Sequence, residues 1–585
     1  MTQIRQNPAS ADPSATLQAT LPGLGACLLT IALGLLSGTA CAGNRDLTAI
    51  ANVSVLTMTR DAVLDKQTVL IEQGKITAIG PAGRLKIPAN ATVIDGSGQF
   101  LMPGLVDFHT HPRGDTELAA FRQYGVTRIV ALGGELLGWH ADARGLAAGS
   151  LPRIVSSTRP VDGYPPLGSN YYSLDQVADV AVALAGEQAG GAGVVKVYSN
   201  LSVPVLQEVA LQAHGLGMPV IGHTPWNSAA ADALDGQIDV VAHGEELFQY
   251  LGETAADADI AAVISRMKRH RVALVPNIVA YALMEQQAYG IADMLKDAQR
   301  EQLSPTSYQE WLPRNNAYAN RQDLDKFRGV LAAGMDKLKR ITHAADQAGV
   351  TLLAGTDAPS FGYSGTSLLD ELGLLSQSGL SNYQVLRTAT ANAAQVFSRF
   401  KKLPSHFGTL EPGQDADLIL LAANPLQDLA ALRQNRGVMI AGHWFSPPQL
   451  ERDRLANRNQ ALAAQHIVDQ YEDLLTHERI DDLIALLKPL PAGGFPKFSS
   501  SVVFRDVNRL AAAGKPELAI RLLSAAEAHI VVTPNYHNVL GGLKWKAGDK
   551  PGAQMEYRAV LAKMPGNAQA LAGLAKLAAA APDAK

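Results

Sequence analysis

The chain has 585 residues, which at about 100 to 200 residues per domain is enough for three or four domains, or for one large barrel with attachments. Its 50 Lys and Arg residues nearly balance 54 Asp and Glu residues, for a net charge of −4, so a nucleic-acid partner is not indicated. With 47% hydrophobic and 18% charged residues, the composition is that of a globular protein and excludes a disordered or fibrous one.

The N-terminal segment predicts export. An apolar run at 28–36 leads to small residues around Cys41, as in a secretory signal, so we expect residues 1–42 to be a signal peptide of a periplasmic or secreted protein. Lipoprotein anchoring at Cys41 is the competing interpretation, which Gly38 disfavours because a larger aliphatic residue is normally found there. The run is shorter than the ~20 residues of a membrane span. Cys27 and Cys41 are the only cysteines, so the mature chain is expected to lack disulfides.

The middle of the chain predicts an α/β fold. Short β segments fill 48–104, and β character returns at 405–446, so we expect one small composite sheet from both flanks. Between them, at 105–400, apolar runs alternate with longer helical patterns, which indicates parallel βα units and a TIM (β/α)8 barrel. The eight predicted strands are 105–109, 126–132, 152–157, 193–199, 218–223, 238–243, 272–278 and 350–357.

Residues 450–585 have a helical pattern with a weak internal repeat. Ala513-Gly514, Ala519 and Ala525 recur 34 positions later as Ala547-Gly548, Ala553 and Ala559, and Pro565 closes the second unit. A period of 34 residues is that of tetratricopeptide helix pairs. The alternative is a plain alanine-rich helical hairpin packed on the barrel.

Metal-binding residue types lie at the ends of the predicted barrel strands. In extended backbone, His109 and His111 are two positions apart and share one face. The carboxyl ends of barrel strands open onto one mouth, where the active sites of such barrels are found. A single histidine there is more often structural, but six such groups together favour a site, because burying them unpaired is costly. The six are His109, His111, Lys196, His223, His243 and Asp357.

These motifs resemble the amidohydrolase superfamily over residues 48–446. The matching segments are PGLVDFHTH (103–111), VVKVYS (194–199), VIGHT (220–224), VVAHG (240–244) and GTDAP (355–359). Within the superfamily, the lysine on the fourth strand is similar to that of bacterial prolidases and Xaa-dipeptidases, and of imidazolonepropionase-like hydrolases.

The resemblance implies a site for two divalent metal ions, with zinc expected and Mn²⁺ or Co²⁺ accepted by the same ligands. It implies that CO₂ carboxylates Lys196 to a carbamate that bridges the metals. His109, His111 and Asp357 would hold one ion, and His223 and His243 the other. Asp357 would also be the catalytic proton carrier. The alternative for Lys196 is an unmodified lysine, or one paired with an acid.

Substrate contacts are predicted less specifically. Tyr198, Arg159 and Trp226 are candidates, each with packing or surface exposure as the alternative. The loop at 158–173 and the tyrosine-rich insertion at 280–328 are expected to form the lid and to determine specificity.

The sequence therefore predicts an exported, metal-dependent hydrolase that cleaves an amide or peptide C–N bond in a dipeptide or N-acyl amino acid. Hydrolysis of a cyclic amide, lactone or carbamate is the second possibility, and a non-catalytic scaffold whose C-terminal helices bind a protein partner is the third. The expected partner is a small molecule. Assembly into a homo-oligomer through the C-terminal helices stays open.

Overall fold

The computed structural model describes residues 47–133, 149–168, 171–252, 255–296, 298–491, 496–564 and 566–579. The predicted signal at 1–42 and both cysteines lie outside these residues, so export stays a prediction. Within the described ranges, no helix is both long and apolar enough to cross a membrane.

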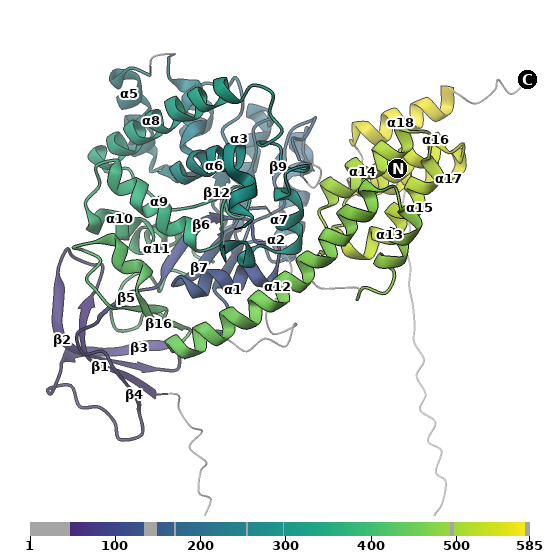
Figure 1. Ribbon diagram of the computed structural model, residues 1–585. Coiled ribbons are helices and arrows are strands. Elements are labelled where there is room, and N and C mark those ends of the chain that lie inside the picture. The colour runs from purple at the N-terminus through teal and green to yellow at the C-terminus, as the bar shows by residue number, and fades with distance from the viewer. Residues whose placement is uncertain are drawn as a thin grey trace, which may run out of the picture. The chain divides into compact units, whose positions relative to one another are not determined.

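A mixed sheet of eight strands is built from both flanks of the chain (Figure 1). Strand β15 joins the two parts, because it pairs antiparallel with β5 on one side and with β16 on the other. Residues 408–417, expected to have β character, precede β15 without forming a named strand. The strands are β1 (Leu47–Leu56), β2 (Val63–Glu72), β3 (Lys75–Pro81), β4 (Thr92–Asp95), β5 (Phe100–Pro103), β15 (Leu418–Leu421), β16 (Asn435–Ile440) and β17 (His443–Phe445).

Seven of the eight predicted barrel strands form as β6 (Leu105–Thr110), β7 (Val126–Ala131), β8 (Arg153–Ser156), β11 (Val195–Val197), β12 (Val220–Gly222), β13 (Val240–Val241) and β14 (Ala273–Leu274). Their pairings are parallel, and a bridge between Ser157 and Val194 continues the barrel from β8 to β11. The short β9 (Val161–Asp162) and β10 (Tyr172–Ser173) extend this sheet at its edge.

The eighth segment, 350–357, closes the barrel without forming a regular strand. Leu352 bridges to Leu274 of β14, and on the other side the Phe108 amide of β6 donates to the Ala354 carbonyl at 2.9 Å. The segment is thus hydrogen-bonded to both neighbours, and its irregular backbone follows from the close approach at its end, described below.

Helices surround the barrel strands (Figure 1). Their buried apolar faces pack on strands such as β6 and β7, in which every residue is buried, as expected for a parallel sheet covered by helices. These helices are α1 (Asp115–Gln123), α2 (Val180–Ala189), α3 (Val203–Leu216), α4 (Ala230–Leu234), α5 (Asp257–His270), α6 (Ile278–Met294), α7 (Pro305–Trp311), α8 (Leu324–Ala348), α9 (Thr366–Gln377), α10 (Asn382–Thr388) and α11 (Ala391–Phe397).

The C-terminal region is helical, and with it the predicted fold class is confirmed. Its helices are α12 (Pro447–Thr476), α13 (Ile480–Leu487), α14 (Ser500–Ala512), α15 (Pro516–Ala526), α16 (Pro534–Lys546), α17 (Lys550–Lys563) and α18 (Ala568–Ala579). Helices α14 and α16 begin 34 residues apart, as do α15 and α17. Ala519 and Ala553, which correspond in the repeat, are both fully buried. The spacing agrees with helix pairs, and the tetratricopeptide assignment stays a prediction.

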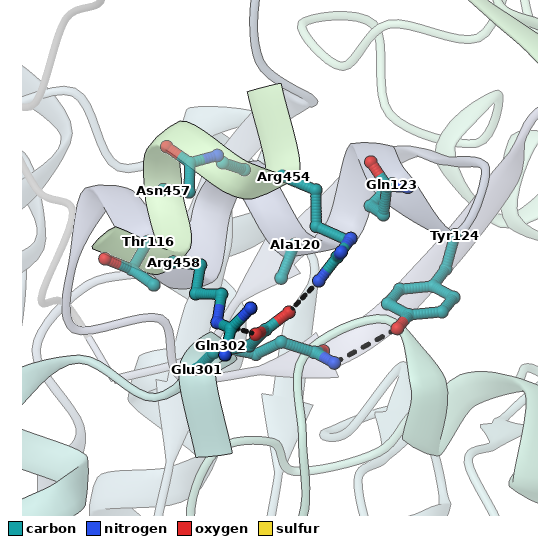
Figure 2. A pocket seen from close by; sticks show the side chains of 10 residues that line it. Thr116, Ala120, Gln123, Tyr124, Glu301, Gln302, Arg454, Asn457 and Arg458 are labelled. Atoms are coloured by element: carbon teal, nitrogen blue, oxygen red, sulfur yellow. Dashed lines mark hydrogen bonds and ion pairs between the residues drawn. The ribbon is translucent and has the colours of Figure 1, made fainter. Parts of the chain in front are cut away.

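Helix α12 is attached to the barrel by a cluster of charges (Figure 2). The Glu301 carboxylate accepts from Arg454 and lies 3.0 Å from Nε of Arg458, while Gln302 Nε2 donates to the Tyr124 hydroxyl at 3.0 Å. The pocket at this cluster has a volume of about 30 Å³, the space of one water molecule, so it is too small for a substrate.

Candidate metal centre and cleft

Three of the predicted ligands meet at the mouth of the barrel. His109 Nε2 lies 3.2 Å from His111 Nε2, and His111 Nε2 lies 3.1 Å from Asp357 Oδ1. Their donor atoms all fall within 4.8 Å of one another. Donor atoms around one tetrahedral zinc ion with bonds of about 2.0 to 2.2 Å lie about 3.3 Å apart, so the spacing suits a single cation.

The other three predicted ligands adjoin this cluster. The His243 ring lies between the other two buried histidines, with its centroid 4.5 Å from that of His109 and 4.8 Å from that of His223. Lys196 is almost completely buried, and its charge lowers the pKa of all three histidines, after burial itself. The structure therefore brings all six predicted groups together.

Hydrogen bonds orient two of the histidine rings. His109 Nδ1 lies 3.1 Å from the Ala242 carbonyl, and His223 Nδ1 lies 2.6 Å from Glu246 Oε1. Each acceptor takes the Nδ1–H, which leaves Nε2 as the ligand nitrogen, and metal-binding histidines are commonly oriented by such a bond from the other ring nitrogen.

The protonation states match a metal-binding role. Burial lowers the pKa of His243 to about 3 and, with Lys196 and His243, holds the pKa of His109 well below its ordinary value. Burial raises the pKa of Asp357, but its interactions with His109, His111 and His243, including a hydrogen bond from His111, outweigh burial and bring that pKa below its ordinary value. Neutral imidazole and ionised carboxylate are the forms that ligate cations.

Backbone geometry at two strand ends explains the glycines beside the ligands. Gly222 has a φ of +153°, and a Cβ there would lie 2.1 Å from the Val197 carbonyl oxygen of the neighbouring strand. At Gly355, a Cβ would lie 2.8 Å from Cβ of His109. Asp357 has a φ of +57° and its amide donates to the His109 carbonyl at 2.7 Å. The eighth segment thus approaches β6 so closely that it departs from strand geometry.

Two acids at the site, the half-buried Glu246 and the buried Asp107, were absent from the predicted set. Glu246 holds His223, whose charge lowers the Glu246 pKa to about 2 against the opposing effect of burial. Asp107 accepts from the Thr356 hydroxyl at 2.7 Å and from the His109 amide at 3.2 Å, and burial raises its pKa to about 7. Asp107 has a sequence signal, since it lies two residues before His109 in the motif at 103–111. Glu246 has none, because only folding places its loop beside β12.

A cleft of about 580 Å³ opens above these residues. It is lined by the ligand candidates His111, Lys196, His223, His243 and Asp357, by barrel loops, and by residues of the C-terminal helical region. The buried His109 forms the base of the cluster. A volume between about 300 and 1,000 Å³ is typical of sites for drug-sized ligands.

The three predicted substrate contacts differ in position. Tyr198 lines the cleft and stacks on His223, with ring centroids 3.8 Å apart. Arg159 also lines it, but its guanidinium is paired with Glu187 at 2.6 Å. Trp226 is 54% exposed and is absent from the described lining, so its surface alternative fits its position. Tyr171, which was not singled out, lines the cleft beside Tyr198, with ring centroids 4.6 Å apart.

The two predicted specificity loops also differ. Arg159, Pro160 and Tyr171 of the loop at 158–173 line the cleft, whereas residues 169 and 170 lie outside the described residues. The insertion at 280–328 contributes Thr306 and Glu310 to the lining. Other apolar residues of the insertion, among them Leu303 and Trp311, pack in one core with the C-terminal helices.

Comparison with known proteins finds a family model that matches part of the chain. The Amidohydrolase family model matches residues 189–445. The chain is 38% identical over 146 residues to 5'-deoxyadenosine deaminase from Methanosarcina mazei, which covers 24% of this chain and 31% of that protein. It is 43% identical over 65 residues to imidazolonepropionase from Idiomarina loihiensis, which covers 11% of this chain and 16% of that protein. The chain thus spans less than a third of either curated relative.

A solved structure extends the likeness over a larger part of the chain. The crystal structure of a protein assigned as a prolidase from Bifidobacterium longum has a TM-score of 0.55 and 22% identity, covering 71% of this chain and 99% of that one. At that identity the likeness concerns the fold. Residues 189–445 match the Amidohydrolase family model, and the barrel and the convergent site agree with that match.

Proposed function

We propose that this protein is a metal-dependent hydrolase that cleaves a C–N bond, of the amide or peptide type, in a small substrate such as a dipeptide or N-acyl amino acid. The observation that carries the proposal is the convergence of His109, His111 and Asp357 on one point at the base of a substrate-sized cleft. Lys196, His223 and His243 line the same cleft.

The donor set would suit two divalent cations. His109, His111 and Asp357 would hold one, and His223 and His243 the other, and Lys196 would contribute to the site as a carbamate if it is carboxylated. Neutral nitrogen donors and one ionised carboxylate suit zinc. When bound, such ions polarise a carbonyl group and lower the pKa of water toward neutrality.

The chain's own groups supply proton transfer and orientation. Asp357 is ionised, so it can accept the proton of the attacking water and pass it to the leaving nitrogen. Burial raises the pKa of Tyr198 to about 12, so its phenol stays protonated at neutral pH and can donate to the substrate's carbonyl oxygen. Glu246 keeps His223 in place throughout.

The first test is substitution of the cluster. We expect His109→Ala and Asp357→Asn to lower kcat/KM by at least about a thousandfold on any amide substrate, because each removes a ligand and Asp357 also the proton acceptor. Turnover is measured on dipeptides, N-acyl amino acids, cyclic amides and lactones, with and without chelator, and folding by circular dichroism. Substitution of the exposed His477 to alanine is the matched control. Full activity in either cluster variant contradicts the mechanism, and ring opening alone would assign the cyclic class.

A further inference from the structure

The C-terminal helical region forms part of the wall of the catalytic cleft. Residues 531–534, which lead into α16, line the same cleft as the metal-ligand candidates, as does the segment before α14. Val531 and Val532 are 47% and 45% exposed, although both are large apolar side chains next to one another. Both valines line the same cavity as the metal-ligand candidates.

Main-chain contacts hold this wall in shape. The amides of Lys497 and Phe498 both donate to the His529 carbonyl, at 2.8 and 3.1 Å. Ser500 Oγ donates to the Val531 carbonyl and accepts from the Val531 amide, each at 3.1 Å. These bonds use only backbone atoms of Val531, which itself lines the cleft.

The wall is also tied to the catalytic loop. Ser499 Oγ donates to Glu310 Oε1 at 2.7 Å, and Arg113 forms an ion pair with the same carboxylate. Arg113 is two residues beyond His111 in the chain. The C-terminal wall, the insertion helix α7 and the loop that carries a ligand candidate are therefore joined through one carboxylate.

We infer that the segment 531–534 forms an outer, apolar subsite that binds the part of the substrate remote from the scissile bond. The inference rests on the proposed function and specifies its substrate class: amides that carry an extended apolar arm. The hydroxyls of Ser499 and Ser500 are already hydrogen-bonded within the wall, so they are not available to hydrogen-bond a substrate. The apolar surface of this wall is that of Val531, Val532 and Pro534, which lie in the same lining as Ser501, Thr533 and Lys563.

The test uses the full chain, prepared with zinc and bicarbonate, and two series of amides. One series is N-acyl glycines from acetyl to decanoyl, and the other is N-acetyl amino acids with side chains from alanine to norleucine. Both kcat/KM and Kd, the latter by calorimetry, are measured for each compound. Each methylene that enters the subsite should improve binding by up to about fourfold. The series that responds shows on which side of the scissile bond the subsite lies.

Variants at the wall show where the gain arises. Val532→Asp should abolish the dependence on chain length, and Val532→Ser should weaken it. Val182→Asp, at an exposed valine of α2 outside the cleft, should leave it unchanged. The subsite is overturned if neither series shows a gain with length, or if Val532→Asp retains the gain. If Kd depends on chain length but no amide is hydrolysed, the subsite is supported and the proposed function is refuted for these amides. If the amides are hydrolysed but neither Kd nor kcat/KM depends on chain length, the proposed function is supported and the subsite is refuted.

Discussion

Single residues at the site act through their neighbours as much as through their own chemistry. Asp357 reaches the cluster from a left-handed backbone, with a φ of +57°, a conformation that costs of the order of 1 to 3 kcal/mol and that the surrounding contacts must offset. His223 presents Nε2 because Glu246 takes its other nitrogen. Glu371, farther away, accepts from the amides of Ile278 and Val279 at the start of α6, just beyond β14.

Glu246→Gln should weaken metal binding without unfolding the barrel. The neutral amide keeps the size of the side chain but loses the charged partner of His223, and such outer partners typically contribute about 10- to 100-fold in metal affinity or activity. Zinc affinity is measured by chelator competition. Glu517→Gln, at an exposed position on α15, is the control and should bind zinc like the parent chain. Parental affinity in Glu246→Gln would mean that the ion pair does not orient the ligand.

Glu371 should make stability depend on pH. Burial raises the pKa of Glu371 in the folded chain from 4.5 to about 8. The hydrogen bonds that its carboxylate accepts from backbone amides lower the pKa, but by less than burial raises it. Between those two values the folded state holds a proton that the unfolded state has lost, so this contribution to stability is complete below about pH 4.5 and is lost as the pH rises to 8. Glu371→Gln cannot ionise and should remove it.

The measurement is the unfolding midpoint in urea at pH 5.5 and 7.5, for the parent chain and Glu371→Gln. Between pH 5.5 and 7.5, the free energy of unfolding of the parent chain should fall by about 2 kcal/mol more than that of the variant. One titrating group can change this free energy by up to about 1.4 kcal/mol per pH unit. Equal losses in the two proteins would show that Glu371 does not titrate in this range.

At the scale of elements, the insertion after β14 attaches the C-terminal helices to the barrel. Gln309 of α7 donates to Glu472 Oε1 of α12 at 3.0 Å and accepts from the Ser499 amide at 2.8 Å. Tyr308 of the same helix donates to Asp469 Oδ1 at 2.8 Å. Helix α7 therefore reaches both α12 and the residue that caps α14, which explains why this insertion carries so much buried surface.

Gln309→Ala should loosen that attachment. It leaves the buried Ser499 amide and one Glu472 oxygen with fewer partners, at a cost of about 1 to 3 kcal/mol. Hydrogen exchange should accelerate in α14 while the amides of β6 and β12 keep their protection. Gln322→Ala, at an exposed position in the same insertion, serves as control and should leave α14 unchanged. Uniform acceleration across the barrel would instead indicate global destabilisation.

At the scale of the molecule, barrel and C-terminal helices share one apolar core. Leu303 and Trp311 of the insertion pack in a cluster with Tyr471 of α12 and Phe498, each of these side chains being fully or almost fully buried. Deleting the C-terminal helices therefore does more than remove an accessory module, because it uncovers this side of the barrel and one wall of the cleft.

A chain that ends at residue 446 should bind a hydrophobic dye and aggregate, since buried apolar surface contributes about 25 cal/mol per Å² and would face water. Dye fluorescence and size-exclusion chromatography check this. A chain that ends at residue 566 lacks only α18, which belongs to a separate small cluster, and should stay monodisperse. If the shorter chain is monodisperse and dye-negative, the shared core does not stabilise the barrel.

The sequence by itself determined the fold class and the six metal-ligand candidates, because strand periodicity and the position of polar residues at strand ends are local properties of the chain. Sheet closure by a non-strand eighth segment was not foreseeable, since it follows from the close contact of Gly355 with His109. Only the tertiary structure brought Glu246 to His223 and the segment 531–534 to the cleft. These contacts join residues that are distant in sequence or lie on separate loops. Tertiary packing determines which of these residues meet, and packing leaves no periodic pattern in the sequence.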